Sequence, residues 1–484
     1  MQVLLILSAV SFVLALLLTA LCRNLFLRAG IVDHPDGLRK LHAAPVPNMG
    51  GIPIAAACLA SFGILFLLGL RIPARPVDVA LMVKLLPAAG IIFATGILDD
   101  RYRLQPIQKL IAQVLASGWA FYAGVHITGI VGHRLPPWLS FAVTMFWLIA
   151  CTNAFNLIDG VDGLAAGVGL FATATTLIAA LMQENLALAA VMAPLLGALL
   201  GFLRYNFNPA TIFLGDSGSL LIGFVLGCCG VIWSQKAATI LGMTAPLIAL
   251  SIPILDVCLS VVRRFLRREP LLRGDRSHIH HRLLDRGFTP RRAVVTMYAA
   301  CGIAACFSIF QSFAESHYSG LVVLVFCGIA WIGVQNLGYA EFDQARKMIL
   351  AGGFRRALNS QLILRAFEQS IASAASLDEC WDALQEAGTK LGFAEVHWSV
   401  AGTLYHKAIW RIDGNAAWSI KIPLEGSDFV SFGRASDTDP LAINISVLAN
   451  AMRDTIGAKD GAPAKLVHAA EEALKKTHFA GAIR

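Results

Sequence analysis

Four groups of polar residues interrupt an otherwise apolar chain, and their types suit the handling of phosphates. They are Asp99 and Asp100 in GILDDR, Asp159 and Asp162 in NAFNLIDGVDGL, Asp216 in FLGDSGSL, and His278, His280 and His281 in DRSHIHHRLLDRG. Carboxylates bind hard cations such as magnesium, and histidines beside arginines bind phosphate and hydroxyl oxygens. The four groups together predict a site for a phosphorylated, metal-bound substrate.

The segment 153–164 is the most specific of the four. It places two Asn, two Asp and two Gly in an apolar region, where a charged group costs up to about 3 kcal/mol at membrane depth. A break between helices that lines a polar cavity removes this cost, and the glycines allow backbone amides to approach a ligand. A merely hydrophilic loop is the alternative.

The adjacent carboxylates of Asp99 and Asp100 are expected at the C-terminal end of a helix. Asp99 and Asp100 repel each other at the unfavourable end of a helix dipole, so we expect a cation beside them: Arg101, Arg103, Lys109 or a divalent metal. The alternative is a solvated loop end.

Asp216 lies among glycines and serines where a helix is expected to begin. Such a turn presents free amides and a positive dipole end to phosphate, and an Asp there can hold a metal ion. Hard oxygen ligands favour Mg²⁺, or Mn²⁺, over zinc. A plain helix cap by Asp216 explains the same pattern equally well.

The loop 263–292 contains ten arginines around its three histidines. Arg276 and Arg282 lie beside the histidines, so we expect the cluster to contact phosphates and a sugar. Zinc binding and attachment to anionic lipid are the alternatives. Asp256, about two turns before Arg263, is interpreted as part of a structural pair, with a role in the site as the alternative.

The elements that must position these residues are membrane helices. The 484 residues are 57% hydrophobic and 14% charged, with a mean hydropathy of +0.66, which indicates an integral membrane protein. We predict an all-α polytopic unit over residues 1–337, with about eleven transmembrane helices long enough to cross roughly 30 Å of hydrocarbon. The predicted spans are 2–22, 50–70, 81–98, 107–125, 138–155, 163–182, 187–204, 212–233, 238–262, 293–313 and 319–337.

Most Lys and Arg residues before residue 337 lie in the loops after odd-numbered spans. The positive-inside rule therefore places these loops in the cytoplasm, the N-terminus outside and the C-terminal region in the cytoplasm. The net charge of +8 largely reflects this bias, so anionic lipid is favoured over nucleic acid as a partner. The scattered cysteines have no CxxC or CxxH spacing, which argues against a zinc or iron–sulfur site and against a disulfide framework.

Apolar runs end at Leu337, and a soluble cytoplasmic α+β domain is predicted over 341–456. The expected order is an amphipathic helix over 341–374 broken near residue 352, a helix opened by a capping box at Ser376, strands at 394–400, 404–412 and 417–424, and a helix over 440–456. The order of elements is similar to a GAF-type module. Residues 457–484 are predicted to be a partly disordered tail.

Five motifs in order resemble the polyprenyl-phosphate N-acetylhexosamine-1-phosphate transferases, the family of the bacterial WecA, TagO and MraY enzymes. They are RKLH with PVPNMGG, GILDDR, NAFNLIDGVDGL, FLGDSGS and HIHHRLL, within residues 30–292. The HIHH form is similar to the WecA/TagO branch. Asn48 departs from the family, which often has Arg before the MGG turn.

The resemblance implies transfer of GlcNAc 1-phosphate, or a related HexNAc 1-phosphate, from UDP-GlcNAc to undecaprenyl phosphate, with release of UMP. This reaction initiates cell-envelope polysaccharide synthesis at the bacterial plasma membrane. The implied catalytic residues are Asp99, Asp100 and Asp216, with Asp216 and Asp100 at the metal. The implied substrate-binding residues are Lys40, His42, Lys109, Asn156, Asp159, Asp162, Arg276, His278, His280 and His281.

Two other classes of protein account for parts of the pattern. A transporter also carries intramembrane carboxylates, but it predicts charges at mid-helix in both halves of the bilayer, whereas here they gather at the expected cytoplasmic ends. A membrane sensor would act through the C-terminal domain, whose ligand or partner the sequence does not indicate. The oligomeric state, with a homodimer as one option, is also open.

Overall fold

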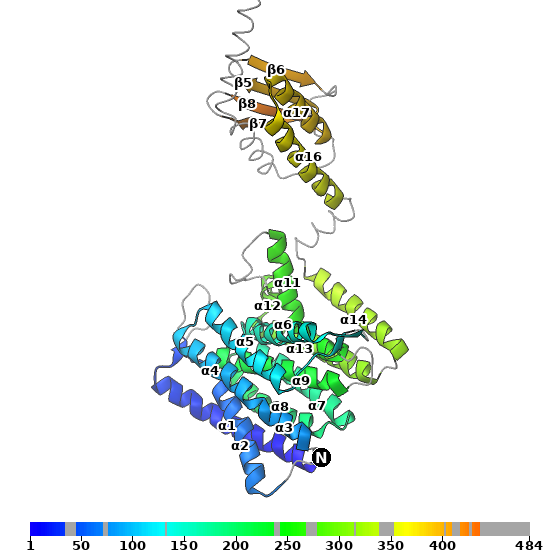
Figure 1. Ribbon diagram of the computed structural model, residues 1–484. Coiled ribbons are helices and arrows are strands. Elements are labelled where there is room, and N and C mark those ends of the chain that lie inside the picture. Colours follow the sequence, from blue (N-terminus) through cyan, green and yellow to red (C-terminus); the bar gives the residue numbers. More distant parts are fainter. Residues whose placement is uncertain are drawn as a thin grey trace, which may run out of the picture. The chain divides into compact units, whose positions relative to one another are not determined.

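The computed structural model describes residues 1–33, 45–70, 76–130, 133–236, 243–267, 278–313, 316–337, 353–400, 403–408, 417–424 and 428–435. The chain divides into two compact units, Met1–Tyr339 and Ala340–Arg484, which are coloured blue to green and yellow to orange in Figure 1. Each unit has its own core, and the division lies close to the predicted end of the apolar runs at Leu337.

The first unit is mostly helical, with two short hairpins. Its helices are α1 (Gln2–Arg28), α2 (Gly51–Leu67), α3 (Pro76–Lys84), α4 (Leu86–Tyr102), α5 (Pro106–Ala123), α6 (Pro137–Ile158), α7 (Leu164–Met182), α8 (Leu186–Asn206), α9 (Gly215–Lys236), α10 (Thr244–Ala249), α11 (Ser251–Arg267), α12 (Ile279–Asp285), α13 (Pro290–Phe313) and α14 (Ser316–Asn336). The hairpins pair β1 (Val32–Asp33) with β2 (Val46–Pro47) and β3 (Gly129–Ile130) with β4 (His133–Arg134).

Eight helices in the described residues are long and apolar enough to cross a membrane, so the chain is a multi-pass membrane protein. They correspond to eight of the predicted spans. The other three are also helical but differ in detail: α2 has only 17 residues, α5 is not among the eight, and span 238–262 contains α10 and α11. The total of eleven crossings stays a prediction.

Helix α9 lies at the centre of the membrane unit. Within its apolar window 83% of the residues are buried, against 17% for the peripheral α14. Helices α4, α6 and α7 pack around it, and its glycines permit close contact. A Cβ on Gly223 would lie 2.6 Å from the carbonyl oxygen of Cys151 in α6. The polar N-terminus of α9 is therefore held among the ends of its neighbouring helices.

The second unit packs two helices against one face of an antiparallel sheet. Helices α16 (Gly353–Ser373) and α17 (Leu377–Lys390) precede the strands β5 (Glu395–Val400), β6 (Thr403–Ala408), β7 (Ala417–Pro423) and β8 (Phe429–Ala435), in the sheet order β6-β5-β8-β7. Alternate residues of β5 are buried in a core that includes Phe367, Leu384 and Phe432, as expected for a sheet covered on one side.

The sequence predictions for this unit are partly met. The Ser376 hydroxyl accepts a hydrogen bond from the Glu379 amide at 3.2 Å, as the predicted capping box requires, while the Glu379 carboxylate accepts from the Ala375 amide rather than from that of Ser376. Strand β8 was not predicted. The predicted helix 440–456 and tail 457–484 lie outside the described residues, and the GAF-type likeness stays a prediction.

Candidate active site

The first part of the site is a join between the MGG turn and the start of α9. The Phe213 amide donates to the Pro47 carbonyl at 2.8 Å, and the Gly50 amide donates to the Phe213 carbonyl at 2.9 Å. A Cβ on Gly51 would lie 2.4 Å from the Gly218 nitrogen, so the two backbones can meet only because no side chain is present. Motifs PVPNMGG and FLGDSGS, far apart in sequence, thus form one structural element.

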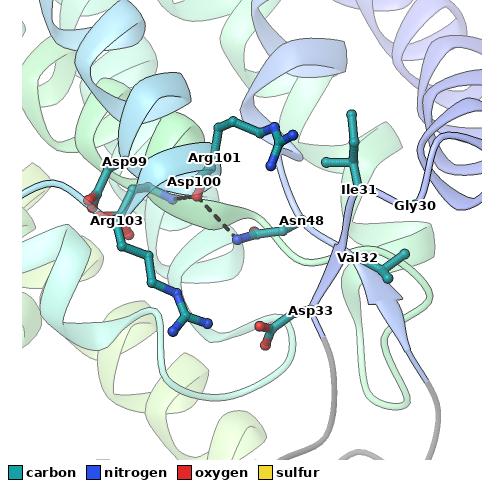
Figure 2. A pocket seen from close by; sticks show the side chains of 10 residues that line it. Gly30, Ile31, Val32, Asp33, Asn48, Asp99, Asp100, Arg101 and Arg103 are labelled. Carbon is teal, nitrogen blue, oxygen red and sulfur yellow. Dashed lines mark hydrogen bonds between the residues drawn. The ribbon is translucent and has the colours of Figure 1, made fainter.

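Asp100 caps α9 from another helix. Its Oδ1 accepts from the Asp216 amide at 2.8 Å, its Oδ2 accepts from the Ser217 amide at 3.0 Å, and Asn48 Nδ2 donates to Oδ1 at 3.2 Å. Figure 2 shows the bond from Asn48. Gly215, with φ +72°, lies against this carboxylate. Two sequence interpretations are corrected here: these two amides are engaged by Asp100, and the cap is not made by Asp216.

Lys109 joins two of the predicted catalytic carboxylates. Its Nζ lies 2.7 Å from Asp99 Oδ2 and 2.9 Å from Asp216 Oδ2. The remaining oxygens are held by neighbours, because Asp99 Oδ1 accepts from the Leu104 amide at 2.6 Å and Asp216 Oδ1 accepts from Asn156 Nδ2 at 2.8 Å. Two carboxylates from α4 and α9 therefore converge on a single cationic position, which the sequence predicted only in outline.

Asp159 lies beside this cluster, at the end of α6. Burial, together with the negative charges of Asp216, Asp100 and Asp162, raises the pKa of Asp159 well above its ordinary value, while a hydrogen bond from the Gly215 amide opposes the shift. A carboxyl in this environment gains strongly from a cation. Its predicted contact with the nucleotide stays a prediction.

Asp162 holds a backbone turn. Its Oδ2 accepts from Asn208 Nδ2 at 3.0 Å and from the Ala210 amide at 2.9 Å, and Arg291 Nε donates to the Asn208 carbonyl at 2.9 Å. This carboxylate therefore fixes the segment between α8 and α9. Its predicted contact with substrate stays a prediction, and the structural contacts account for its position.

Asp256 anchors the histidine motif. Buried in α11, it contacts His278 Nδ1 through Oδ2 at 2.9 Å and accepts from the Ile279 amide through Oδ1 at 2.7 Å. One carboxylate thus orients the first histidine and caps α12. The structural role expected for Asp256 is thus met through His278 and Ile279, and a pairing with Arg263 stays a prediction.

His280 connects this motif to the turn after α6. A Cβ on Gly160 would lie 2.8 Å from His280 Nε2, and the His280 ring lies 4.2 Å from that of His281. Both ring nitrogens of His280 are buried without a hydrogen-bond partner among the described residues. Burial, followed by the charge of His281, lowers the pKa of His280 to about 3, against the pull of Asp256. The ring is therefore neutral near pH 7.

A cavity of about 440 Å³ opens beside the capped end of α9. It is polar, and Figure 2 shows Asp33, Arg101 and Arg103 around it. Its complete lining is Gly30, Ile31, Val32, Asp33, Asn48, Asp99, Asp100, Arg101, Arg103 and Asp216. A cavity with two arginines next to clustered carboxylates suits a phosphate group that is bound together with a metal ion.

The four predicted motifs therefore come together in space. Asp99, Asp100, Asp159 and Asp216 form one cluster, and the histidines reach it through Gly160. The predicted binding residues Lys40, His42 and Arg276 lie outside the described residues. Sequence reasoning missed Asn48 as a support and His278 as the partner of Asp256, although each is a polar residue within or beside a motif.

A polytopic helical unit with one cluster of carboxylates, a lysine and histidines at helix ends defines a membrane transferase for phosphorylated substrates. Residues 82–234 match glycosyl transferase family 4. The chain is 33% identical to the probable undecaprenyl-phosphate N-acetylglucosaminyl 1-phosphate transferase of Bacillus subtilis, over 60% of this chain and 79% of that protein.

Two further relatives are similar to the chain. One is the decaprenyl-phosphate N-acetylglucosaminephosphotransferase of Mycolicibacterium smegmatis, 33% identical over 59% of this chain and 77% of the relative. The other is the undecaprenyl-phosphate alpha-N-acetylglucosaminyl 1-phosphate transferase of Salmonella typhi, 30% identical over 59% of this chain and 77% of the relative. The chain belongs to the polyprenyl-phosphate N-acetylglucosamine-1-phosphate transferase family, as its motifs predicted.

Proposed function

We propose that the chain transfers N-acetylglucosamine 1-phosphate from UDP-GlcNAc to undecaprenyl phosphate. An oxygen of the lipid phosphate attacks the sugar-bearing β-phosphorus, the bond from that phosphorus to the UMP oxygen breaks, and UMP leaves. The product is the lipid-linked pyrophosphoryl sugar that initiates an envelope polysaccharide. The observation that carries the proposal is the convergence of Asp99 and Asp216 on one cationic position, beside a cavity with two arginines.

The residues of this cluster fit a magnesium ion, with manganese as the alternative. Asp216 and Asp99 direct hard carboxylate oxygens at one position, which Lys109 Nζ occupies at 2.9 Å and 2.7 Å from them. Asp100, predicted at the metal, already accepts three N–H donors, so the geometry favours Asp99 as the partner of Asp216. The ion, when bound, would neutralise negative charge on the pyrophosphate.

The other residues bind and orient the two anionic substrates. Arg101 and Arg103 bind phosphate oxygens in the cavity, and Lys109 holds the position between Asp99 and Asp216 that the metal ion would take over when bound. A phosphomonoester has its second pKa near 6, so the lipid phosphate is mostly a dianion at neutral pH. Asp99 therefore contributes more by orienting the nucleophile than by removing a proton.

The histidine motif binds the phosphosugar. His280 is neutral and has hydrogen-bonding capacity at both ring nitrogens, which suits hydroxyl and phosphate oxygens. His278, oriented by Asp256, and His281 lie beside it. Asp159 and Asn156 stand between this motif and the carboxylates, where we place the nucleotide pyrophosphate.

We place the enzyme in the bacterial plasma membrane with the site in the cytoplasm. The loops expected to be cytoplasmic are the basic ones, and they bear all four motifs. UDP-sugars are made in the cytoplasm, so this orientation gives the site its donor. Attachment of a fluorophore to cysteines introduced at residues 33 and 103 from the cytoplasmic side alone tests the orientation.

The function is tested by UMP release from purified protein in detergent with undecaprenyl phosphate. UDP-GlcNAc, UDP-GalNAc and UDP-MurNAc-pentapeptide are compared, each with Mg²⁺ and with EDTA. Preference for UDP-GlcNAc with loss of activity in EDTA is expected, and absence of lipid-linked product with all three donors contradicts the proposal. Radiolabelled phosphosugar retained on the protein without lipid acceptor would contradict the one-step transfer.

A further inference from the structure

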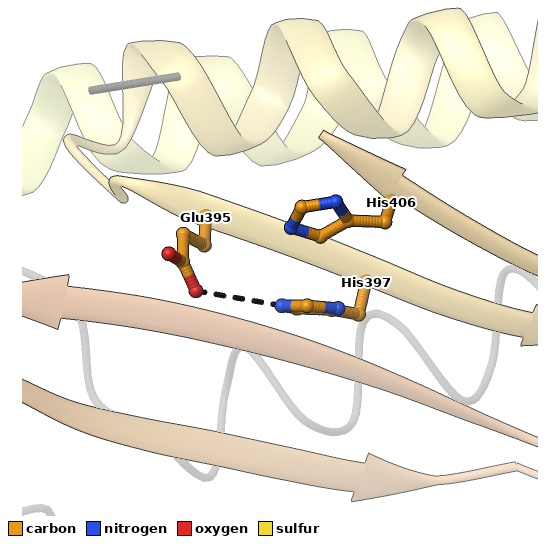
Figure 3. A group of neighbouring side chains, drawn as sticks. All are labelled: Glu395, His397 and His406. Atoms are coloured by element: carbon orange, nitrogen blue, oxygen red, sulfur yellow. Dashed lines mark hydrogen bonds and ion pairs between the residues drawn. The ribbon is translucent and has the colours of Figure 1, made fainter. Parts of the chain in front are cut away.

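Three potential metal ligands share one face of the sheet in the C-terminal unit. Glu395 and His397 are two residues apart on β5, and His406 on β6 is the register partner of His397. Because side chains alternate along a strand, all three lie on the face opposite the buried Val396 and Trp398. Figure 3 shows the three side chains on this face, with the Glu395 carboxylate directed toward His397.

The distances suit a small ion. One ligand atom from each residue lies within 4.8 Å of the other two, and Glu395 Oε2 is 3.5 Å from His397 Nε2. A tetrahedral zinc ion with bonds near 2.0–2.1 Å holds its ligand atoms about 3.4 Å apart. The first pair already has this spacing, and the His406 ring, 4.3 Å from the His397 ring, needs only a side-chain rotation.

The three side chains are accessible to an ion from solvent, and two nearby lysines contact other groups. The side chains of His397 and Glu395 are 32% and 37% exposed, so an ion can enter from solvent. Lys407 donates to Gln385 on α17, at the other face of the sheet. Lys421, on the same face as the three groups, lies over the Phe429 ring at 3.7 Å.

We propose that Glu395, His397 and His406 bind a divalent ion of the zinc class, with one position left open. Two imidazoles and a carboxylate favour Zn²⁺ over the Mg²⁺ proposed for the membrane unit, whose ligands are carboxylate oxygens alone. The site lies outside residues 82–234 that match the transferase family. It is thus a separate property of the C-terminal unit.

Metal binding has a structural consequence at the sheet edge. Among the described strands, the order β6-β5-β8-β7 places β6 at an edge of the sheet, where a strand is joined to the sheet on one side only. An ion held by β5 and β6 adds a second connection between them. Zinc should therefore slow amide hydrogen exchange in β6 more than in β7, which contributes no ligand.

The test uses the full chain in detergent, first stripped with EDTA and then titrated with Zn²⁺ against a chromophoric chelator. His406→Ala, His397→Ala and Glu395→Gln are compared with wild type, and His133→Ala, at another exposed histidine, is the matched control. We expect each site variant to weaken zinc binding at least about 10-fold and to lose the zinc-dependent protection of β6. The control should retain both.

Substitution with Co²⁺ gives an independent readout, since a four-coordinate site has strong visible absorption that His406→Ala should abolish. Hydrogen exchange of the metal-free variants shows whether β5 and β6 are intact, and Glu395→Gln keeps the shape of its side chain. Wild-type affinity and wild-type protection in the folded site variants would overturn the proposal. Loss of zinc affinity and of zinc-dependent protection in the folded variants supports the proposed metal site, whether or not the same samples retain transferase activity.

Discussion

The carboxylate cluster and the histidine motif satisfy their polar groups in different ways. Asp99, Asp100 and Asp216 all accept hydrogen bonds from named donors within the described structure. His280 is as deeply buried as any of them, yet both its ring nitrogens lack a partner there. A buried polar group without a partner costs about 1–3 kcal/mol. The contrast shows that the carboxylates are held by their neighbours, whereas the ring nitrogens of His280 would gain partners if, as we propose, this ring contacts the phosphosugar.

Replacing Asp216 should have the largest effect on activity. Asp216→Asn removes the negative charge that meets Lys109 and the proposed metal, so we expect UMP release to fall about 10³-fold or more. The amide keeps an oxygen for Asn156 Nδ2, and the protein should therefore stay folded. UMP release and thermal unfolding in detergent measure the two effects.

The matched control for this prediction is Asp285→Asn, at an exposed residue of α12, which should retain wild-type activity. Addition of excess Mg²⁺ should not restore Asp216→Asn. Wild-type turnover by Asp216→Asn would show that the carboxylate cluster is purely architectural, and the comparison with His280 would lose its basis.

Replacing Asp100 should separate assembly from chemistry. Asp100→Ala leaves the amides of Asp216 and Ser217 without their acceptor, so we expect a loss of about 1–3 kcal/mol in the free energy of unfolding. Activity should fall roughly 10²-fold through displacement of Asp216. Asp100→Asn, which retains one acceptor oxygen, should recover part of both losses.

Hydrogen exchange at residues 215–219 checks this explanation. Faster exchange of the Asp216 and Ser217 amides is expected in Asp100→Ala, with no change at the far end of α9. A variant that is inactive but has unchanged exchange and stability would instead give Asp100 a direct role at the metal, as the sequence predicted.

How far the sequence predicts this molecule depends on the kind of contact. Long apolar runs specify helices directly, and eight predicted spans are confirmed as helices that can cross a membrane. Span 238–262 was predicted as one helix because hydropathy does not report backbone breaks. Pro253 lacks the N–H that would bond to Ala249, and the chain accordingly divides into α10 and α11 at Leu250.

The site was predictable as a set of motifs but not as a set of partners. Asp216 was read as a cap or a phosphate-binding turn because both patterns are local. The actual cap, Asp100, comes from a helix 116 residues away, and no local pattern predicts such a pairing. Likewise Asp256 is placed near Arg263 by helical spacing, while its partner His278 follows a long loop.

His280 provides a pH test of the same comparison. Its pKa is about 3 when folded and about 6.5 when unfolded, so between these values the unfolded chain binds a proton that the folded chain does not. The free energy of unfolding is therefore highest, as far as His280 is concerned, above pH 6.5. It decreases as the pH falls toward 3, by up to about 1.4 kcal/mol per pH unit. Thermal unfolding from pH 7.5 to 4.5 should show this slope reduced in His280→Gln.

The exposed His133 is the control for this titration, and His133→Gln should keep the wild-type slope. His280→Gln should also lower UMP release roughly 10-fold, chiefly through a higher KM for the UDP-sugar, because the lost contacts are to bound substrate. An unchanged KM together with an unchanged pH slope would mean that the His280 ring neither binds ligand nor stays neutral by burial.

The smallest effect is expected where the two regions touch, at Gly160. Gly160→Ala places a Cβ 2.8 Å from His280 Nε2, so the imidazole ring must shift. The ring nitrogens of His280 are still present in this variant. We expect KM for the UDP-sugar to rise about 3-fold, with kcat and the Asp216 cluster unaffected. Gly118→Ala, at a helix position where an added Cβ would have no neighbour within 4 Å, is the matched control and should be neutral. In a double variant with His280→Gln the effect of Gly160→Ala should disappear, since both act on one ring. Additive effects would show that Gly160 contacts the ligand through its own backbone.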